Sequence, residues 1–217
     1  MRLYLDTADR EAAEALLGTG LFTGVTTNPT ILQRSGLGVG DAPDIYDWAV
    51  AAGAREVFFQ AWGEDTATLV ERGEELRSLG DEVVVKVVAS RAGSAACARL
   101  SASDIPTLLT AVYAPGQAIV AAAAGATYIA PYLGRLNDAG RDGIAEVTAM
   151  HEVLRATGSA TKVLLASIRD VTSMVTLARR GVDCFTMGPE IAEGFFAEHL
   201  TATAVQDFED AVRTMSA

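Results

Sequence analysis

The chain is poor in the residues that build several common kinds of site. Its two cysteines, Cys97 and Cys184, lie far apart without metal-ligand spacing, so neither a disulfide framework nor a zinc site is predicted, and both should be reduced core thiols. Its two histidines, His151 and His199, fall in or near helical runs, where packing or surface roles are expected. No dinucleotide-binding glycine motif and no P-loop motif occurs, which removes the usual support for those chemistries.

Positive charge and long apolar runs are also scarce. The 217 residues carry 17 Lys and Arg against 28 Asp and Glu, a formal net charge of −11. This balance repels a phosphate backbone, so we expect no nucleic-acid and no membrane partner, although two arginines could still hold one small phosphate. The longest apolar stretch, 118–126, is about half of a membrane span. The N-terminus leads straight into a strand pattern without the features of a signal peptide, so a cytoplasmic location is expected.

What the sequence does contain is a regular alternation of short β-rich runs and longer helical runs. The expected strands are 2–6, 24–27, 57–61, 83–88, 107–112, 127–131, 162–167 and 184–187, followed by helices at 10–17, 43–52, 66–79, 94–100, 116–124, 143–156, 171–179 and 190–199. Repeated βα units require parallel strands, and eight of them favour closure into a barrel over an open sheet. We therefore predict an α/β fold: one domain over 1–217, a single (β/α)8 TIM barrel with an extra C-terminal helix near 205–215.

A single lysine interrupts the most apolar of these strands. Lys86 lies within 82–89, a valine-rich run typical of a strand buried on both sides. Burial lowers the pKa of an ammonium group, and the resulting neutral amine can attack a carbonyl and form a Schiff base. The alternatives are a lysine that reaches solvent from a strand end and one that pairs with a carboxylate from another strand.

Polar residues also follow the other strands, at the end where a parallel barrel holds its chemistry. In strand order they are Asp6, Thr26, Asn28, Gln60, Thr110, Tyr132, Arg135, Ser167 and Arg169. Taken alone, Asp6 could cap the first helix, Asn28 could form a turn, and Thr110 could be a core hydroxyl bonded to the backbone. With Lys86 included, seven consecutive strands contribute, and a shared site explains them better than separate structural roles.

These positions resemble the small-subunit branch of the transaldolase and fructose-6-phosphate aldolase family, over essentially the whole chain. The resemblance is carried by the motifs at 5–8, 24–30, 84–87, 105–107, 130–132 with Arg135, and 166–169. It implies a metal-independent class I aldolase without a cofactor, in which Lys86 forms a covalent Schiff base with a ketose. It also implies a homo-oligomer, a pentamer or decamer, in which the helix at 205–215 reaches a neighbour.

The resemblance also suggests roles on the donor side of the site. Asp6 is expected to bind donor hydroxyls and to support proton transfer, while Asn28 and Ser167 hold the donor and Thr26 supports them. The iminium formed on Lys86 stabilises the enamine left when the carbon–carbon bond breaks, so no metal is needed.

On the acceptor side, a water held by Gln60, Thr110 and Tyr132 is expected to move the proton to and from the acceptor oxygen. Arg135 and Arg169 would bind the phosphate of a sugar-phosphate acceptor as bidentate donors. The alternative for each arginine is a surface salt bridge.

Two chemistries are open within the family. Transaldolases transfer a dihydroxyacetone unit between sugar phosphates in the pentose phosphate pathway, and they typically carry Glu and Phe where this chain has Gln60 and Tyr132. Aldolases of the family carry Gln and Tyr and reversibly add dihydroxyacetone or hydroxyacetone to an aldehyde such as glyceraldehyde 3-phosphate. We therefore predict the aldolase, with the transaldolase as the alternative because 133–136 and 167–169 are closer to that side. A non-catalytic phosphosugar-binding barrel would not need Lys86 in an apolar strand.

Overall fold

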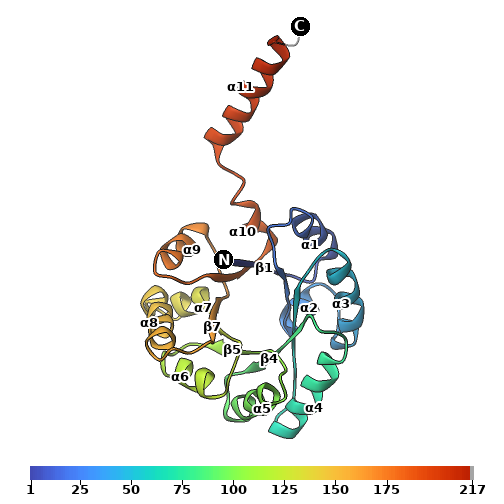
Figure 1. Ribbon diagram of the computed structural model, residues 1–217, viewed down its shortest axis with the longest axis vertical. Helices are drawn as coiled ribbons and strands as arrows, with labels where there is room; N and C mark the ends of the chain where they lie inside the picture. Colours follow the sequence, from blue (N-terminus) through green and yellow to red (C-terminus); the bar gives the residue numbers. More distant parts are fainter. Residues whose placement is uncertain (216–217) are drawn as a thin grey trace.

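The computed structural model describes residues 1–215 and confirms the eight-stranded parallel barrel. The strands close in sequence order, and the helices form a ring around them (Figure 1). The strands are β1 Arg2–Asp6, β2 Gly24–Thr26, β3 Glu56–Gln60, β4 Val83–Val88, β5 Thr107–Val112, β6 Tyr128–Pro131, β7 Lys162–Leu165 and β8 Cys184–Met187. Because β8 pairs with β1, every strand of the barrel has a neighbour on both sides.

The helices predicted after each strand begin within three residues of their expected starts. The helices are α1 Arg10–Leu17, α2 Pro29–Arg34, the 3-10 helix η1 Val39–Asp41, α3 Ala42–Ala51, α4 Thr66–Arg77, α5 Arg91–Ala102, α6 Gly116–Ala123, α7 Leu133–Asp138, α8 Gly143–Ala156, α9 Val171–Ala178, α10 Pro189–Glu193 and α11 His199–Met215. The side chain of Asp9 accepts a hydrogen bond from the Ala12 amide and caps α1. The alternative in which Asp6 caps this helix is therefore wrong.

Three short elements, α2, η1 and α7, are absent from the expected pattern. Each spans six residues or fewer, too short for a helical period to stand out from a loop. The helix expected at 190–199 ends at Glu193, where Gly194 forms its C-cap, and the last helix begins at His199 instead of 205. The expected single domain over 1–217 includes 216–217, which lie outside the described residues, and it stays a prediction.

Apolar side chains fill two separate layers. One lies between the strands and the helices and includes Leu5, Val85 and the free thiol of Cys97. The other fills the inside of the barrel and consists of Tyr4, Phe58, Val84, Leu108, Tyr128, Ala130, Leu164, Ala166 and Cys184. Both cysteines are buried and unpaired, as predicted. Since strand side chains alternate between the two faces, the residue two positions further along the same strand is expected to face inward as well.

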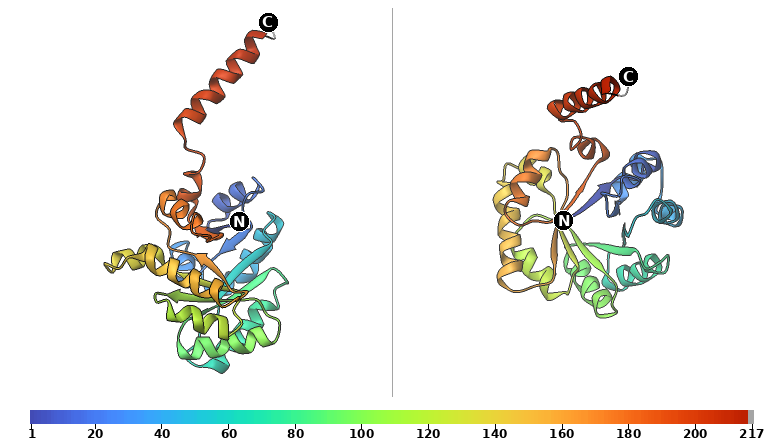
Figure 2. Two further views of the ribbon diagram at one scale, coloured as in Figure 1. Left: turned by 60° about the vertical axis from the view of Figure 1, so that its left-hand side comes forward. Right: turned by 45° about the horizontal axis from the view of Figure 1, so that its top comes forward.

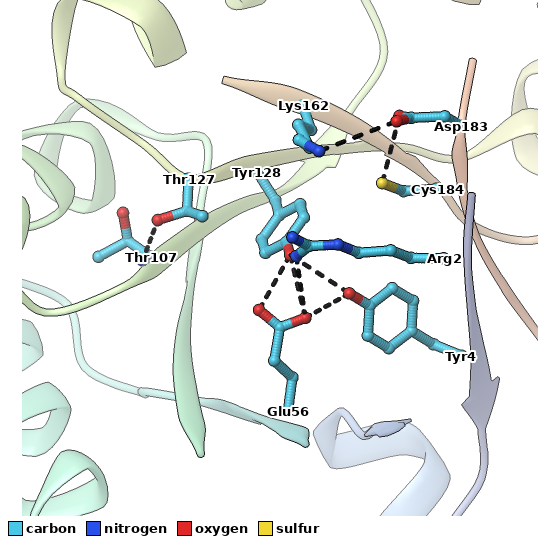
Figure 3. Close-up of polar contacts among 9 residues, drawn as sticks. All are labelled: Arg2, Tyr4, Glu56, Thr107, Thr127, Tyr128, Lys162, Asp183 and Cys184. Atoms are coloured by element: carbon cyan, nitrogen blue, oxygen red, sulfur yellow. Dashed lines mark hydrogen bonds and ion pairs between the residues drawn. The ribbon is translucent and has the colours of Figure 1, made fainter. Parts of the chain in front are cut away.

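A polar network closes the amino-terminal end of the barrel (Figure 3). The Glu56 carboxylate accepts hydrogen bonds from the hydroxyls of Tyr4 and Tyr128, the latter at 3.0 Å, and the Arg2 guanidinium lies 3.5 Å away. Burial and this carboxylate raise the pKa of both tyrosines, so their hydroxyls stay protonated and the network stays intact. With this end filled, the carboxyl ends of the strands are left as the open mouth of the barrel.

The last helix differs from the rest of the fold. Helix α11 has no buried residue and extends away from the barrel (Figures 1 and 2). Within residues 1–215, no helix combines the length and apolar character needed to cross a membrane.

Candidate active site

A cavity of about 330 Å³ opens at the carboxyl ends of the strands. Nine of the ten predicted site residues line it, and they are Asp6, Thr26, Asn28, Lys86, Thr110, Tyr132, Arg135, Ser167 and Arg169. The fold therefore brings together side chains that are as much as 163 positions apart, the separation of Asp6 and Arg169 (169 − 6). Gln60 is the predicted residue that does not line this cavity.

Strand alternation explains how most of these side chains reach the cavity. Each stands two positions after a residue of the interior layer, so it faces the barrel axis one step closer to the mouth. The pairs are Tyr4 and Asp6, Val84 and Lys86, Leu108 and Thr110, and Ala130 and Tyr132. The same rule adds Thr186, which follows Cys184 on β8 and also lines the cavity.

The ammonium group of Lys86 is buried and has a single hydrogen-bond acceptor. Lys86 is 5% exposed, and its Nζ donates a hydrogen bond to the backbone oxygen of Thr27 at 2.6 Å. Among the described residues it forms no ion pair with a carboxylate, so both alternatives, a solvent-reaching lysine and a paired one, are excluded. Burial lowers the pKa of Lys86, and the nearby Asp6 charge opposes that shift without cancelling it. The neutral fraction of this amine is thus larger than that of an ordinary lysine.

Asp6 completes a short chain of hydrogen bonds across three strands. The Thr26 hydroxyl lies 2.6 Å from Asp6 Oδ1 and 2.6 Å from the Thr186 hydroxyl. Burial raises the pKa of Asp6, while Lys86, the Thr26 hydroxyl and Arg135 act in the opposite direction. Within residues 1–215, no cluster of three or more His, Cys, Asp or Glu is arranged to hold a metal ion.

On the opposite side of the cavity, the Thr110 hydroxyl lies 2.7 Å from the Tyr132 hydroxyl. The alternative in which the Thr110 hydroxyl is bonded to the backbone is therefore wrong. The pairing of β5 and β6 shifts register between Leu109 and Val112, where Ala111 has a φ of 56°. Such a bulge redirects the side chains beside it. Burial also raises the pKa of Tyr132.

Gln60 stands apart from this pair. Its Cα is in register with that of Lys86, but its side chain lines a narrow adjoining cavity together with Thr27, Asn28 and Trp62. In the described part of the chain it makes no hydrogen bond to Thr110 or Tyr132. A water that contacts all three would have to bridge the two cavities.

Two loops fix the donor-side residues. Asn28 caps α2 by accepting a hydrogen bond from the Ile31 amide at 3.0 Å, so its turn role and its place in the cavity coexist. Ser167 has a φ of 56°, a strained conformation for a residue with a Cβ atom. The amide of Gly134 donates to the Ser167 carbonyl at 2.8 Å, and a Cβ at position 134 would lie 2.6 Å from that oxygen. Only glycine lets α7 approach this closely.

The arginines at the mouth differ in their partners. Arg169 forms a two-point salt bridge with Asp138, one of whose contacts is 2.6 Å, so the salt-bridge alternative describes this arginine. Arg135 lies over the Tyr132 ring at 4.8 Å and forms no ion pair among the described residues. A third arginine, Arg34 at the end of α2, also lines the cavity.

The sequence patterns missed Arg34, Asp138 and Thr186. Thr186 was detectable, because it continues the inward alternation of a strand that was correctly placed. Arg34 and Asp138 each end a six-residue helix that was expected to be a loop, so nothing indicated the side they face.

Comparisons with known proteins identify the family of the chain and match its fold. The profile of the family described as Transaldolase/Fructose-6-phosphate aldolase matches residues 3–217. Similar proteins include a "Probable transaldolase" of Coprothermobacter proteolyticus, 36% identical over 96% of this chain and 94% of that protein, and a "Probable transaldolase" of Nitrosopumilus maritimus, 32% identical over 96% and 93%. Among solved structures, mandelate oxidase with benzoyl-formic acid superposes with a TM-score of 0.60 at 18% identity, over 87% of this chain and 64% of that one. This last likeness concerns the barrel fold alone.

Proposed function

Because the chain belongs to the transaldolase/fructose-6-phosphate aldolase family, we propose that it is a Schiff-base aldolase of the fructose-6-phosphate aldolase type. The observation that carries this proposal is Lys86, a buried amine of lowered pKa inside a cavity whose lining includes hydroxyl, carboxylate and guanidinium groups. A non-catalytic phosphosugar-binding barrel would gain nothing from desolvating an ammonium group in this way. The proposed donors are dihydroxyacetone and hydroxyacetone, and the acceptor is an aldehyde such as glyceraldehyde 3-phosphate.

The reaction begins at the lysine. Neutral Lys86 Nζ attacks the ketose carbonyl, and loss of water from the resulting carbinolamine gives an iminium. When the carbon–carbon bond breaks, its electron pair moves into the iminium and leaves an enamine, while the adjacent hydroxyl loses its proton and becomes the aldehyde. Protonation of the enamine carbon and addition of water then release the donor. The iminium is the electron sink, so the chemistry needs no cofactor.

Neighbouring groups supply the proton transfers and hold the donor. Asp6 binds donor hydroxyls and takes part in proton transfer, which suits a carboxyl whose pKa burial has raised. Asn28 and Ser167 line the same cavity and offer an amide and a hydroxyl to the donor. Thr26 holds Asp6 through a 2.6 Å hydrogen bond.

The acceptor side combines the Thr110 and Tyr132 hydroxyls with the arginines. A water beside the hydroxyl pair, with Gln60 at its far side, carries the proton to and from the acceptor oxygen. Arg135 and Arg169 bind the acceptor phosphate, which requires Arg169 to exchange at least part of its contact with Asp138 for the phosphate.

The aldolase proposal depends on Gln60 and Tyr132. A neutral amide can orient water but cannot deprotonate it, and the tyrosine hydroxyl adds a proton donor next to Thr110. The transaldolase remains the second candidate for two reasons. The similar proteins are named probable transaldolases, and the arginines at the mouth suit a phosphorylated donor as well as a phosphorylated acceptor.

One assay separates the two candidates. The wild-type enzyme is mixed with fructose 6-phosphate alone, and release of glyceraldehyde 3-phosphate is followed through a coupled dehydrogenase. The aldolase releases it without an acceptor, whereas release only after addition of erythrose 4-phosphate identifies the transaldolase. In the aldolase, Gln60→Glu combined with Tyr132→Phe should raise the ratio of transfer to cleavage.

We also propose that the enzyme is cytoplasmic and forms a homo-oligomer of five or ten chains. Support for the assembly comes from α11, whose exposed apolar side chains fall at helical spacing and are Leu200, Val205, Phe208, Val212 and Met215. A stripe of this kind on a helix that leaves its own barrel suits burial against a second copy of the chain.

A further inference from the structure

The eighth strand contributes a hydroxyl that the proposed mechanism does not yet use. Thr186 on β8 is 3% exposed, lines the cavity, and its hydroxyl lies 2.6 Å from the hydroxyl of Thr26, which is 1% exposed. Thr26 in turn contacts Asp6 Oδ1 at 2.6 Å. The three side chains come from β8, β2 and β1, and β1 pairs with both of the others, so the contact between Thr186 and Thr26 reaches across β1.

The number of available protons fixes which group donates in each hydrogen bond between Thr186, Thr26 and Asp6. A threonine hydroxyl has one proton, and an ionised carboxylate can only accept. When Asp6 is ionised, the single Thr26 proton must point to Asp6, so the second short contact can exist only if Thr186 donates to Thr26. When Asp6 carries a proton, both hydroxyls can reverse, with Asp6 donating to Thr26 and Thr26 donating to Thr186.

Ordinary structural roles do not account for the pair. Two buried threonines outside the cavity donate to backbone carbonyls, Thr27 to Phe58 at 2.9 Å and Thr161 to Ala126 at 2.7 Å, whereas Thr110 inside the cavity pairs with the Tyr132 hydroxyl. In the described part of the chain, the hydroxyls of Thr26 and Thr186 contact only each other and Asp6. These hydroxyls therefore act on the Asp6 carboxyl group, Thr26 directly and Thr186 through Thr26.

We propose that Thr186 is a positioning residue of the reaction, which donates to Thr26, aligns the Thr26 hydroxyl on Asp6, and reverses with it when Asp6 takes up a proton. The proposal rests on the proton-transfer role of Asp6 in the proposed function. It explains why a hydroxyl stands at the inward position of β8, although Thr186 does not itself touch Asp6.

The other groups around Asp6 set the sign of the expected effect. Burial raises the pKa of Asp6 and Glu190 at the start of α10 adds to the rise, while Lys86 on β4, the Thr26 hydrogen bond and Arg135 on α7 lower it. Tyr132 on β6 also interacts with Asp6 but is neutral near pH 7, since burial raises its own pKa. Loss of the Thr186 donor weakens the Thr26 hydrogen bond, so the pKa of Asp6 should rise further.

The test compares Thr186→Val, which keeps the shape and removes the donor, with Thr186→Ser, which keeps the donor. We measure the pH dependence of fructose 6-phosphate cleavage, with erythrose 4-phosphate added so that either candidate reaction is recorded. Thr186→Val should lower kcat about tenfold and move the acidic limb to higher pH, whereas Thr186→Ser should retain the wild-type limb. Thr186→Ala, which also lacks the donor, serves if the valine variant does not fold.

Thr161→Val is the matched control, because it removes a buried threonine hydrogen bond away from the cavity. It should lower Tm and leave the pH profile unchanged. If Thr186→Val also lowers only Tm, or keeps the wild-type profile, the positioning role is overturned. Borohydride trapping of dihydroxyacetone on wild-type Lys86 is run in parallel: no trapping contradicts the proposed function, while trapping with an unchanged Thr186→Val profile contradicts only this inference.

Discussion

At the scale of single residues, the cavity buries a lysine and an aspartate, Lys86 and Asp6, where water cannot stabilise their charged forms. Burial lowers the pKa of Lys86 and raises that of Asp6, even though the two groups attract each other. The neutral fraction of the lysine, which is the nucleophile, is thereby increased, and the pKa of the carboxyl moves closer to the working pH, where it can both accept and return a proton. The sequence predicted the lysine from a single ionisable residue in a valine run, but the compensating partners became visible only in three dimensions.

The lowered pKa of Lys86 predicts a specific pH dependence. Only the neutral amine forms the carbinolamine, so the initial rate of iminium trapping should rise with pH to a plateau, with a midpoint below the ordinary lysine pKa of 10.5. Asp6→Asn should move the midpoint lower still, because the Asp6 charge raises the lysine pKa. A midpoint at or above the ordinary value would show that the amine is not desolvated before the donor binds.

The arginines at the mouth should act on phosphorylated acceptors alone. Arg135→Gln is expected to raise KM for glyceraldehyde 3-phosphate roughly tenfold and to leave KM for glyceraldehyde nearly unchanged. Tenfold is the low end for loss of a charge-assisted hydrogen bond, and it is chosen because Arg135 is exposed. Arg34→Gln should act in the same direction. Asp138→Asn should lower KM for the phosphorylated acceptor, because it frees Arg169.

Arg141→Gln is the control for these variants, since Arg141 is paired with Glu146 and does not line the cavity. Steady-state kinetics with both acceptors measures the effect. Equal changes for glyceraldehyde and its phosphate would mean that the arginines hold the fold and not the substrate.

At the scale of elements, the site depends on where short helices meet strand ends. Helix α7 begins with two backbone hydrogen bonds to the end of β7, from the amides of Leu133 and Gly134 to the carbonyls of Ala166 and Ser167. This contact sets Arg135 and Arg169 at one side of the mouth. The period of the sequence predicts the strands and the long helices, but a six-residue helix has fewer than two turns, so no period indicates α2 and α7.

Gly134→Ala tests this junction. The added Cβ would meet the Ser167 carbonyl oxygen at 2.6 Å, so α7 and the end of β7 must separate. We expect the free energy of unfolding to fall by roughly 1–3 kcal/mol and KM for phosphorylated acceptors to rise. Gly116→Ala, at a helix start with no atom within 4 Å of the new Cβ, should be neutral in chemical denaturation and in kinetics. Equal behaviour of the two variants would contradict the close-packing account.

Helix α11 should hold the oligomer together. Phe208 is 70% exposed near the middle of its apolar stripe, so Phe208→Glu would place a charge in the proposed contact between copies and should shift the protein to smaller species. Gln206→Glu adds the same charge on the opposite face of the helix and should leave the assembly intact. Light scattering coupled to size exclusion measures both. An unchanged mass for Phe208→Glu would exclude α11 from the interface.

At the scale of the whole molecule, the barrel was predictable because eight βα units leave few ways to close a parallel sheet. Nine predicted site residues lie together for the same reason: they follow strands whose ends must meet. Gln60 shows the limit of this argument, since its strand position is as expected but its side chain lines an adjoining cavity. Contacts such as Arg169 with Asp138 depend on loop geometry, which no periodic pattern encodes.

The central claim is that Lys86 forms a covalent iminium with the donor, and borohydride reduction tests it most directly. Wild-type enzyme is incubated with dihydroxyacetone and borohydride, its intact mass is measured, and the modified peptide is mapped. The account predicts one reduced donor per chain, attached to Lys86, and none in Lys86→Met, which should fold but not turn over. Active enzyme whose Lys86 stays unmodified under these conditions, or a donor attached elsewhere, would contradict the account.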